Sequence, residues 1–313
     1  MANGITTTAQ VDPEVGIYFD NILLDRDEPY FVYKYFAQQR RIPQKNSKTA
    51  IFRRYENLAD ALTPLTEGVT PNAEQVSKFD ITAVVSQYGK VVELSDDIIV
   101  TVQDQTSNEV ADMLAQNQAS TYDKLISNML VATASQISCL NGFNGNAVTE
   151  LTVIDEELAV DYLMGNNGRK MAPHIEANTG IGTQPVWAAY WQASHTDLRS
   201  DIKSLGNFLP TAAYPRQMSV MQAELGSLDE VRVVISSVAP KSAAATPIYS
   251  NLMFAANGYG CIDIDNQSME MIIKPLGAGD DSLNQRSTMG WKGRLGAVIL
   301  DDSWVINLLS TRS

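Results

Sequence analysis

Hydrophobic residues recur at helical spacing over one long segment of the chain. From Val102 to Leu130 they follow intervals of three and four residues, and glycine and proline are absent from Ser95 through Leu140. Because both residues interrupt helices, their absence predicts an unusually long helix from Ser95 to about Leu140, capped by Ser95. No strict heptad persists along it, which argues against a coiled coil.

Two segments before this helix have the composition of strands. TAIFRRYE (49–56) and FDITAVVSQYGKVVEL (79–94) are rich in β-branched and aromatic residues, and proline and glycine interrupt the segment between them. The pattern predicts an extended hairpin with a long irregular tip. Because a two-stranded hairpin is marginal in water, it needs a surface to lie on. That surface is either the core of its own chain or a neighbouring subunit.

The second half of the chain mixes helix and strand signals. Thr152 and Asp155 form a helix-start pair, and a short helix capped near Ser194 is expected. Strands are expected in PVWAAYWQ (185–192), VRVVISSV (231–238), NLMFAA (251–256), MEMIIKPL (269–276), GRLGAVIL (293–300) and SWVINLL (303–309). The chain as a whole is therefore predicted to be of the α+β class.

The first 45 residues carry two weaker helix patterns, one starting at Asp12 and one in PYFVYKYFAQQRR (29–41). In the second, aromatic and basic residues interleave, as they do in proteins that bind single-stranded nucleic acid. Its apolar members recur at helical intervals, which favours packing instead. These members are Phe31, Val32, Tyr35 and Phe36.

Charge is distributed unevenly. The chain of 313 residues has 23 Lys and Arg against 36 Asp and Glu, a net charge of -13 that argues against a general nucleic-acid binder. Lys34–Arg54 nevertheless contains seven basic residues and no acid. This basic run is either a solvated loop or an arm that lies against an acidic surface of another copy, for which Glu56–Asp123 is one candidate.

The residues needed for catalysis or metal binding are scarce. Two cysteines and two histidines are too few for a disulfide framework or a cysteine-based zinc site, and no phosphate-binding glycine motif or nucleophile elbow occurs. The acids at 263 and 265 begin like a calcium loop, but the required glycine is missing. We therefore expect no enzymatic activity, cofactor or metal. An α+β enzyme remains an alternative that loss of turnover on mutating His195 would support.

Several longer segments resemble the major capsid proteins of tailed bacteriophages, and in detail the coliphage N-four-like major capsid family. They are RIPQKNSKTAIFRRYENLADALTPLTEGVTP (41–71), ITAVVSQYGKVVELSDDI (81–98), HTDLRSDI (195–202), AELGSLDEVRVVISS (223–237) and IKPLGAGDDSLNQRSTMGWKGRLGAVILDDSWVINLL (273–309). The resemblance is collinear over nearly the whole chain. The Ser- and Ala-rich segment Lys241–Asn251 fits less well and looks like a local insertion.

The resemblance implies the Hong Kong 97-like capsid fold and a division into five parts. Residues 1–45 would be an N-terminal arm and 46–94 an extended hairpin loop. Residues 95–150 would be a peripheral domain with a long spine helix. Residues 151–268 would be an axial domain, and 269–313 would return as strands of the peripheral domain.

The same resemblance implies a function. The chain would assemble into the pentamers and hexamers of an icosahedral shell around double-stranded DNA, in the virion after assembly in the host cytoplasm. A separate scaffolding protein, a portal and a decoration protein would be its partners, and DNA would be met only by non-specific proximity. The shell of an encapsulin-like, non-viral compartment is the alternative. Contacts between subunits are expected at Arg40, Arg41, Lys45, Arg53, Arg54, Tyr55, Leu65, Glu67 and Val69.

Overall fold

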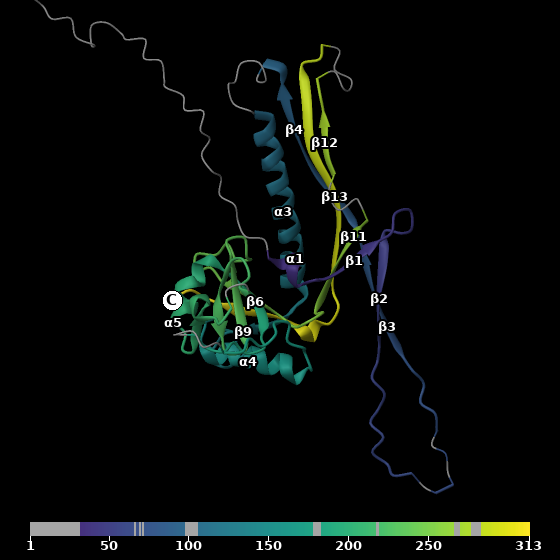
Figure 1. Ribbon diagram of the computed structural model, residues 1–313. Coiled ribbons are helices and arrows are strands. Elements are labelled where there is room, and N and C mark those ends of the chain that lie inside the picture. Colours follow the sequence, from purple (N-terminus) through teal and green to yellow (C-terminus); the bar gives the residue numbers. More distant parts are fainter. Residues whose placement is uncertain are drawn as a thin grey trace, which may run out of the picture.

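The computed structural model describes residues 32–65, 67–68, 70, 72–97, 106–177, 183–216, 219–265, 270–276 and 283–313. These residues form a five-stranded sheet, a seven-stranded sheet and a separate two-stranded hairpin (Figure 1). A long helix runs beside the first sheet, and the second sheet lies in the compact part of the molecule. The helix predicted to start at Asp12, and Phe31, lie outside the described residues.

The long helix, α3, extends over Thr106–Thr133, and its 28 residues span about 42 Å. The prediction that it continues to about Leu140 is wrong, because β5 (Ser135–Ser138) follows it and pairs in parallel with a C-terminal strand. Long-range pairing thus overrides a local sequence that contains no helix breaker. Ser95 ends strand β4, and residues 98–105, which would join the two elements, are outside the described part.

The five-stranded sheet is organised around β13, the longest strand. Its members are β1 (Gln38–Ile42), β4 (Ser86–Ser95), β11 (Tyr259–Ile264), β12 (Glu270–Lys274) and β13 (Arg286–Ile299). Helix α3 packs on it through Tyr122, whose ring meets Trp291 edge-on at 6.0 Å. The Trp291 indole N–H donates to Asn117 Oδ1 at 3.2 Å. Helix and sheet form one unit, as Figure 1 shows.

The seven-stranded sheet has the order β5-β14-β10-β6-β9-β8-β7. Besides β5, its strands are β6 (Tyr190–His195), β7 (Phe208–Pro210), β8 (Glu224–Leu228), β9 (Val231–Ser236), β10 (Tyr249–Phe254) and β14 (Val305–Ser310). The strands predicted at 231–238, 251–256 and 303–309 are confirmed as β9, β10 and β14. Those predicted at 269–276 and 293–300 are confirmed in the five-stranded sheet, where β13 begins earlier than predicted, at Arg286. The one predicted to begin at Pro185 starts at Tyr190.

Helices cover the seven-stranded sheet. Buried residues of α4 (Val153–Gly165) and α5 (Arg199–Ser204) form one core with it, and α1 (Tyr33–Phe36) and α3 contribute to a second core. The predicted helix start at Thr152 is confirmed as a capping box, in which Thr152 and Asp155 accept each other's backbone N–H groups. No helix among the described residues has the length and apolar character needed to cross a membrane.

The helix predicted in residues 29–41 is shorter than expected. Among its described residues, from Val32 onward, the helix is limited to Tyr33–Phe36, and Gln38–Ile42 is instead a strand that pairs in parallel with β11. Packing is the correct interpretation for Val32 and Phe36, which are buried, and wrong for Tyr35, which is 71% exposed. A single helical turn can bury only one side, and Tyr35 lies on the other.

Candidate inter-subunit surfaces

The hairpin formed by β2 (Thr49–Tyr55) and β3 (Lys78–Val84) projects from the body of the molecule (Figure 1). Every described residue from Arg53 to Asp80 is exposed. Apolar side chains are among them, including Leu62 at 88% exposure and Leu65 at 77%. Apolar side chains gathered on a protruding element are typical of surfaces that another chain covers.

The base of the hairpin packs on its own chain. Phe52 and Ala83 are buried with Ile262 in a small core beneath the hairpin. A side chain at Gly260 would place its Cβ 2.7 Å from the Phe52 ring, so glycine is required there. The hairpin is therefore held at its base by its own sheet, while the described part of residues 56–77 extends beyond that support.

Most of the basic run contacts groups of its own chain. The Arg53 guanidinium pairs with Asp80 at 2.7 Å, and this hydrogen bond lowers the pKa of Asp80. Arg54 pairs with Asp301. Three further contacts complete this set: Arg41 lies 3.8 Å from Asp263, Arg40 covers the Phe52 ring at 4.5 Å, and the Lys34 ammonium lies 5.9 Å from the Tyr122 ring.

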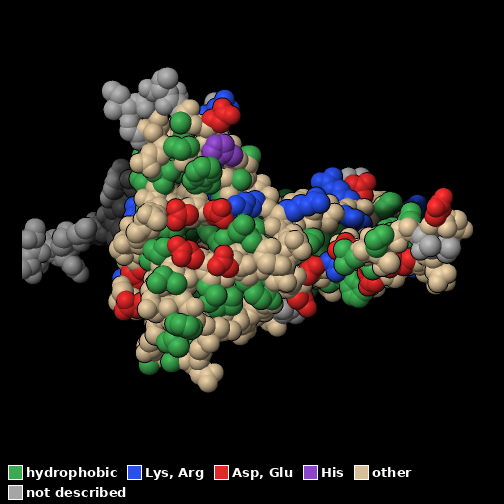
Figure 2. Space-filling model, turned by 90° about the horizontal axis from the view of Figure 1, so that it is seen from below, with side chains coloured by type: hydrophobic (Ala, Val, Ile, Leu, Met, Phe, Trp, Pro, Cys, Tyr) green, Lys and Arg blue, Asp and Glu red, His purple; other side chains and the backbone are tan. Residues whose placement is uncertain are grey.

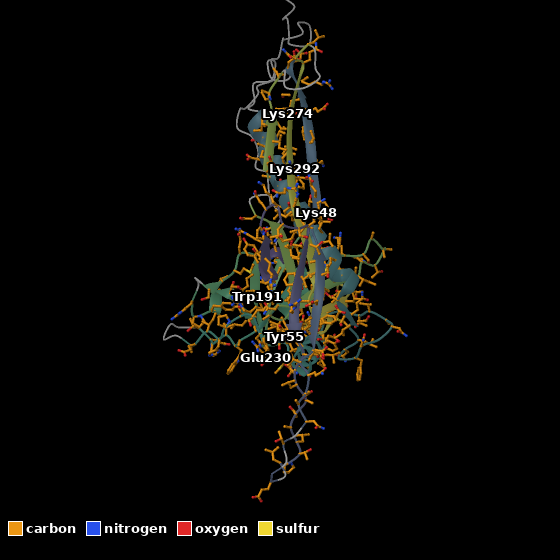
Figure 3. The ribbon with its side chains drawn as sticks, turned by 90° about the vertical axis from the view of Figure 1, so that its right-hand side faces the viewer. Lys48, Tyr55, Trp191, Glu230, Lys274 and Lys292 are labelled. Carbon is orange, nitrogen blue, oxygen red and sulfur yellow. The ribbon has the colours of Figure 1, made fainter. Side chains whose placement is uncertain are left out.

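Lys45 and Lys48 are the two members of the run for which the described residues supply no partner. Both lie on the exposed turn Pro43–Lys48 between β1 and β2, where Lys45 has a positive φ of 63°. Figure 3 shows Lys48 above the level of Tyr55, which lies where the hairpin leaves the body. The turn thus presents two ammonium groups to solvent.

Eight of the nine residues predicted to contact neighbours are described, and all eight are exposed. They are Arg40, Arg41, Lys45, Arg53, Arg54, Tyr55, Leu65 and Glu67. Val69 lies outside the described residues. Exposure is necessary for contact with another subunit, and that contact stays a prediction for each of them.

A groove of about 480 Å³ lies between α4 and the turn that joins β8 to β9. Five acidic residues line it. Glu157 and Asp161 of α4 and Asp229 and Glu230 of the turn form its rim, and the buried Glu156 is the fifth. Its walls are apolar and include Val160, Met164, Trp187 and Leu228. Figure 2 shows acidic side chains gathered on this face of the molecule. Sequence reasoning missed the groove because its residues come from three separate segments.

The carboxylate of Glu156 lies at the groove and is 2% exposed. Its Oε1 accepts a hydrogen bond from Gln192 Nε2 at 2.8 Å, whereas Oε2 has no hydrogen-bond partner among the described residues. Burial raises the pKa of Glu156 to about 7. A buried carboxylate oxygen without a donor is costly, and protonation of Glu156 lessens that cost.

A buried ion pair fixes the sheet next to this groove. Arg232 donates from two nitrogens to the two oxygens of Glu224, each at 2.7 Å, and both side chains are almost fully buried. The guanidinium lies 4.4 Å from the centre of the Trp191 ring, which Figure 3 places inside the body. The pair is enclosed by protein, and its position indicates a structural role.

The short helix expected near Ser194 begins with a 3-10 turn (Thr196–Leu198) that His195 caps. Its Nδ1 accepts the backbone N–H of Asp197 at 3.1 Å, so the cap is His195 and not Ser194. Burial lowers the pKa of His195 despite the neighbouring Asp197 carboxylate. The described residues contain no group of three or more His, Cys, Asp or Glu side chains placed to hold a metal ion.

Comparison with solved structures identifies the fold. No family model matches the chain, and no curated relative matches it either. The capsid of Helicobacter pylori bacteriophage KHP30 matches with a TM-score of 0.71 and 11% identity over 99% of this chain and 100% of that one. The capsid of Ralstonia phage GP4 matches with a TM-score of 0.70 and 12% identity over 99% of both chains. The capsid of cyanophage P-SCSP1u matches with a TM-score of 0.67 and 15% identity over 100% of this chain and 97% of that one. These full-length matches confirm the predicted α+β capsid fold: the chain is folded as bacteriophage capsid proteins are.

Proposed function

We propose that this chain is the major capsid protein of a tailed bacteriophage and that it assembles into the pentamers and hexamers of an icosahedral shell. The observation that carries the proposal is the match of fold, over essentially the full length of both chains, to capsid structures from several phages. Fold alone does not fix function, so the projecting hairpin is a needed second support. An isolated subunit would leave the apolar residues of that hairpin in water.

The hairpin explains how one chain can bind copies of itself. Its base is fixed by Phe52 on its own sheet, and its outer part projects where a neighbour can cover Leu62 and Leu65. Closed symmetry repeats each such contact around the shell, so modest contacts add to a stable assembly. We expect several thousand Å² of surface to be buried for each subunit, as in obligate interfaces.

The residues that we propose at these contacts are those of the arm, the turn and the hairpin. They are Arg40, Arg41, Lys45, Arg53, Arg54, Tyr55, Leu65, Glu67 and Val69. The peripheral and axial domains would be those expected from the sequence, with changed boundaries. Strands β5 and β14, expected in the peripheral domain, belong to the seven-stranded sheet, and β11, expected in the axial domain, belongs to the five-stranded sheet. Strand β4 pairs with β13 over ten residues, which supports placing Ser86–Ser95 in the peripheral domain.

The partners follow from the same proposal. A separate scaffolding protein would direct assembly, a portal would occupy one vertex, and a decoration protein could bind outside. Packaged double-stranded DNA would lie near the shell without specific contacts, because a chain of net charge -13 repels phosphate. The protein would reside in the virion capsid after assembly in the host cytoplasm. Its role would be structural, without catalysis or cofactor.

Electron microscopy of the chain, expressed with the scaffolding protein of its phage, tests the proposal. We expect closed shells with pentameric and hexameric units. The matched control is the Leu62→Ser/Leu65→Ser variant, which changes two exposed side chains and should leave the subunit folded but unassembled. A wild-type chain that remains a 34.3 kDa monomer under these conditions would contradict the proposal. Shells that enclose a protein cargo and never DNA would favour the encapsulin-like alternative.

A further inference from the structure

The exposed turn between β1 and β2 carries positive charge that its own chain leaves unpaired. Five of the seven cations in Lys34–Arg54 lie beside acidic or aromatic groups of the same chain. The ammonium groups of Lys45 and Lys48 have no partner among the described residues. Six exposed residues, 43–48, form this turn, so a surface on another molecule can reach both lysines.

The groove beside α4 has the complementary character. Glu157 and Asp161, one turn apart on α4, make no ion pair or hydrogen bond with the described residues. Of the other two carboxylates, Glu230 pairs with Lys170 at 2.8 Å and Asp229 accepts from Asn207 at 3.3 Å. Only Glu230 is paired with a cation, so the rim keeps about three uncompensated negative charges above apolar walls.

The apolar lining of the groove indicates what kind of side chain it accepts. Val160 and Met164 of α4 line it together with the exposed carboxylates of Glu157 and Asp161. A lysine side chain suits such a site, because its aliphatic stem can lie along Val160 and Met164 while its ammonium donates three hydrogen bonds. The size and polarity of the groove fit one or two such side chains from a protruding turn.

We propose that the groove of each subunit receives the Pro43–Lys48 turn of a second copy of this chain, with Lys45 and Lys48 beside Glu157 and Asp161. This inference rests on the proposed function, which brings copies into contact. Within one chain the two surfaces are apart: Figure 3 shows Lys48 and Glu230 at different levels of the molecule. Figure 1 likewise places the β1–β2 turn on the far side from α4. The pairing is therefore between subunits.

A cysteine pair tests the proximity directly. The native Cys139 and Cys261 are buried and should not react, so a chain with Lys48→Cys and Asp161→Cys has two accessible thiols. Mild oxidation of assembled shells should then give covalent multimers on a non-reducing denaturing gel, and reductant should return them to one band. The matched control pairs Asp161→Cys with Lys274→Cys, an exposed lysine of β12. No more multimer from the test pair than from the control would overturn the inference.

Charge reversal tests whether the contact matters for assembly. Either Lys45→Glu/Lys48→Glu or Glu157→Lys/Asp161→Lys alone should place like charges together. We expect each to raise the protein concentration needed for assembly by about tenfold or more. The variant that carries all four changes restores opposite charges and should assemble near the wild-type concentration. If the quadruple variant needs as high a concentration for assembly as the double variants, the groove has another partner and the inference fails.

The two proposals can fail separately. If wild-type shells form but the cysteine pair does not link, the docking inference fails and the capsid function stands. If the wild type forms no shells, the capsid function fails, and the same cysteine pair is then oxidised in concentrated solution. Disulfide-linked multimers in that solution would still support docking of the turn in the groove, and their absence would overturn it.

Discussion

The backbone N–H of Tyr33 donates to Asp123 Oδ1 at 2.9 Å, which ties the short helix α1 to the middle of α3. On the other side of α1, the Tyr259 hydroxyl of β11 donates to the Tyr33 carbonyl. Burial of the Asp123 carboxylate raises its pKa to about 6. The N-terminal segment is therefore fixed to the body by a buried polar contact in addition to the packing of Phe36.

Two substitutions of Asp123 distinguish the contribution of its hydrogen bond to stability from that of its charge. Asp123→Ala leaves the buried Tyr33 N–H without an acceptor, and we expect the free energy of unfolding to fall by about 1–3 kcal/mol. Asp123→Asn keeps an acceptor and should cost less than half as much at pH 8. Urea unfolding measures both, and hydrogen exchange should show faster exchange near Tyr33 in the alanine variant alone. Equal losses in the two variants would contradict this assignment.

Glu156 makes stability depend on pH. Its pKa rises from 4.5 in the unfolded chain to about 7 in the folded one, so the folded state holds its proton more tightly. The resulting stabilisation is fully present below about pH 4.5 and is lost as pH rises through about 7, a change of about 3 kcal/mol. Glu156→Gln cannot ionise and should remove this component.

The difference between wild type and Glu156→Gln isolates this effect from other groups. His195 has a lowered pKa, so it acts with the opposite sign, destabilising the fold as pH falls below 6.5. Because both proteins contain His195, its contribution cancels. The stability gained by Glu156→Gln should therefore be larger at pH 8 than at pH 5, as measured by urea unfolding at each pH. A gain that does not vary with pH would exclude a raised pKa.

The buried pair of Arg232 and Glu224 should be sensitive to removal of one partner. Arg232→Met leaves the Glu224 carboxylate buried with only Tyr214 and Met221 as donors. We expect a loss of about 3–5 kcal/mol in the free energy of unfolding. Arg312→Met, at an exposed position, is the matched control and should change stability by less than about 0.5 kcal/mol. A small loss from Arg232→Met would mean that the site admits water.

The hairpin should separate folding from assembly. Phe52→Ala removes a buried ring from its base and should lower the unfolding free energy by about 3–5 kcal/mol. Leu65→Ser, at an exposed tip position, should change it by less than about 0.5 kcal/mol yet prevent shell formation. Thermal unfolding and electron microscopy of the same preparations give the two readouts. Shells from Leu65→Ser as abundant as those of wild type would remove the tip from the proposed interface.

Local patterns were sufficient for much of the fold. The capping box at Thr152 predicted the start of α4, and short apolar or β-branched runs predicted β2, β9, β10 and β14. Such runs are typical of strands, and β9, β10 and β14 are buried along nearly their whole length. The collinear resemblance to phage capsid proteins then predicted how these elements are arranged. The prediction of the capsid fold used the local patterns and this resemblance together.

The errors arise where distant pairing decides the conformation. Residues 135–138 follow a helical pattern without interruption, yet they form β5 because β14 offers a parallel partner. Gln38–Ile42 continues an amphipathic pattern but pairs with β11. Neither partner is visible within a local window. The acidic groove is hidden for the same reason, since α4 and the turn at Asp229 meet only after the sheet has formed.

Strand β13 links the two ends of the molecule in one covalent segment. It pairs with β4 over ten residues and with β11 over four more, and a short turn then leads into β14, which lies between β5 and β10 in the other sheet. Tension applied along it would load these hydrogen bonds in shear, so that many must break together. A shell built from such subunits would resist stretching under internal pressure through its backbone ladders, without needing strong side-chain contacts along that direction.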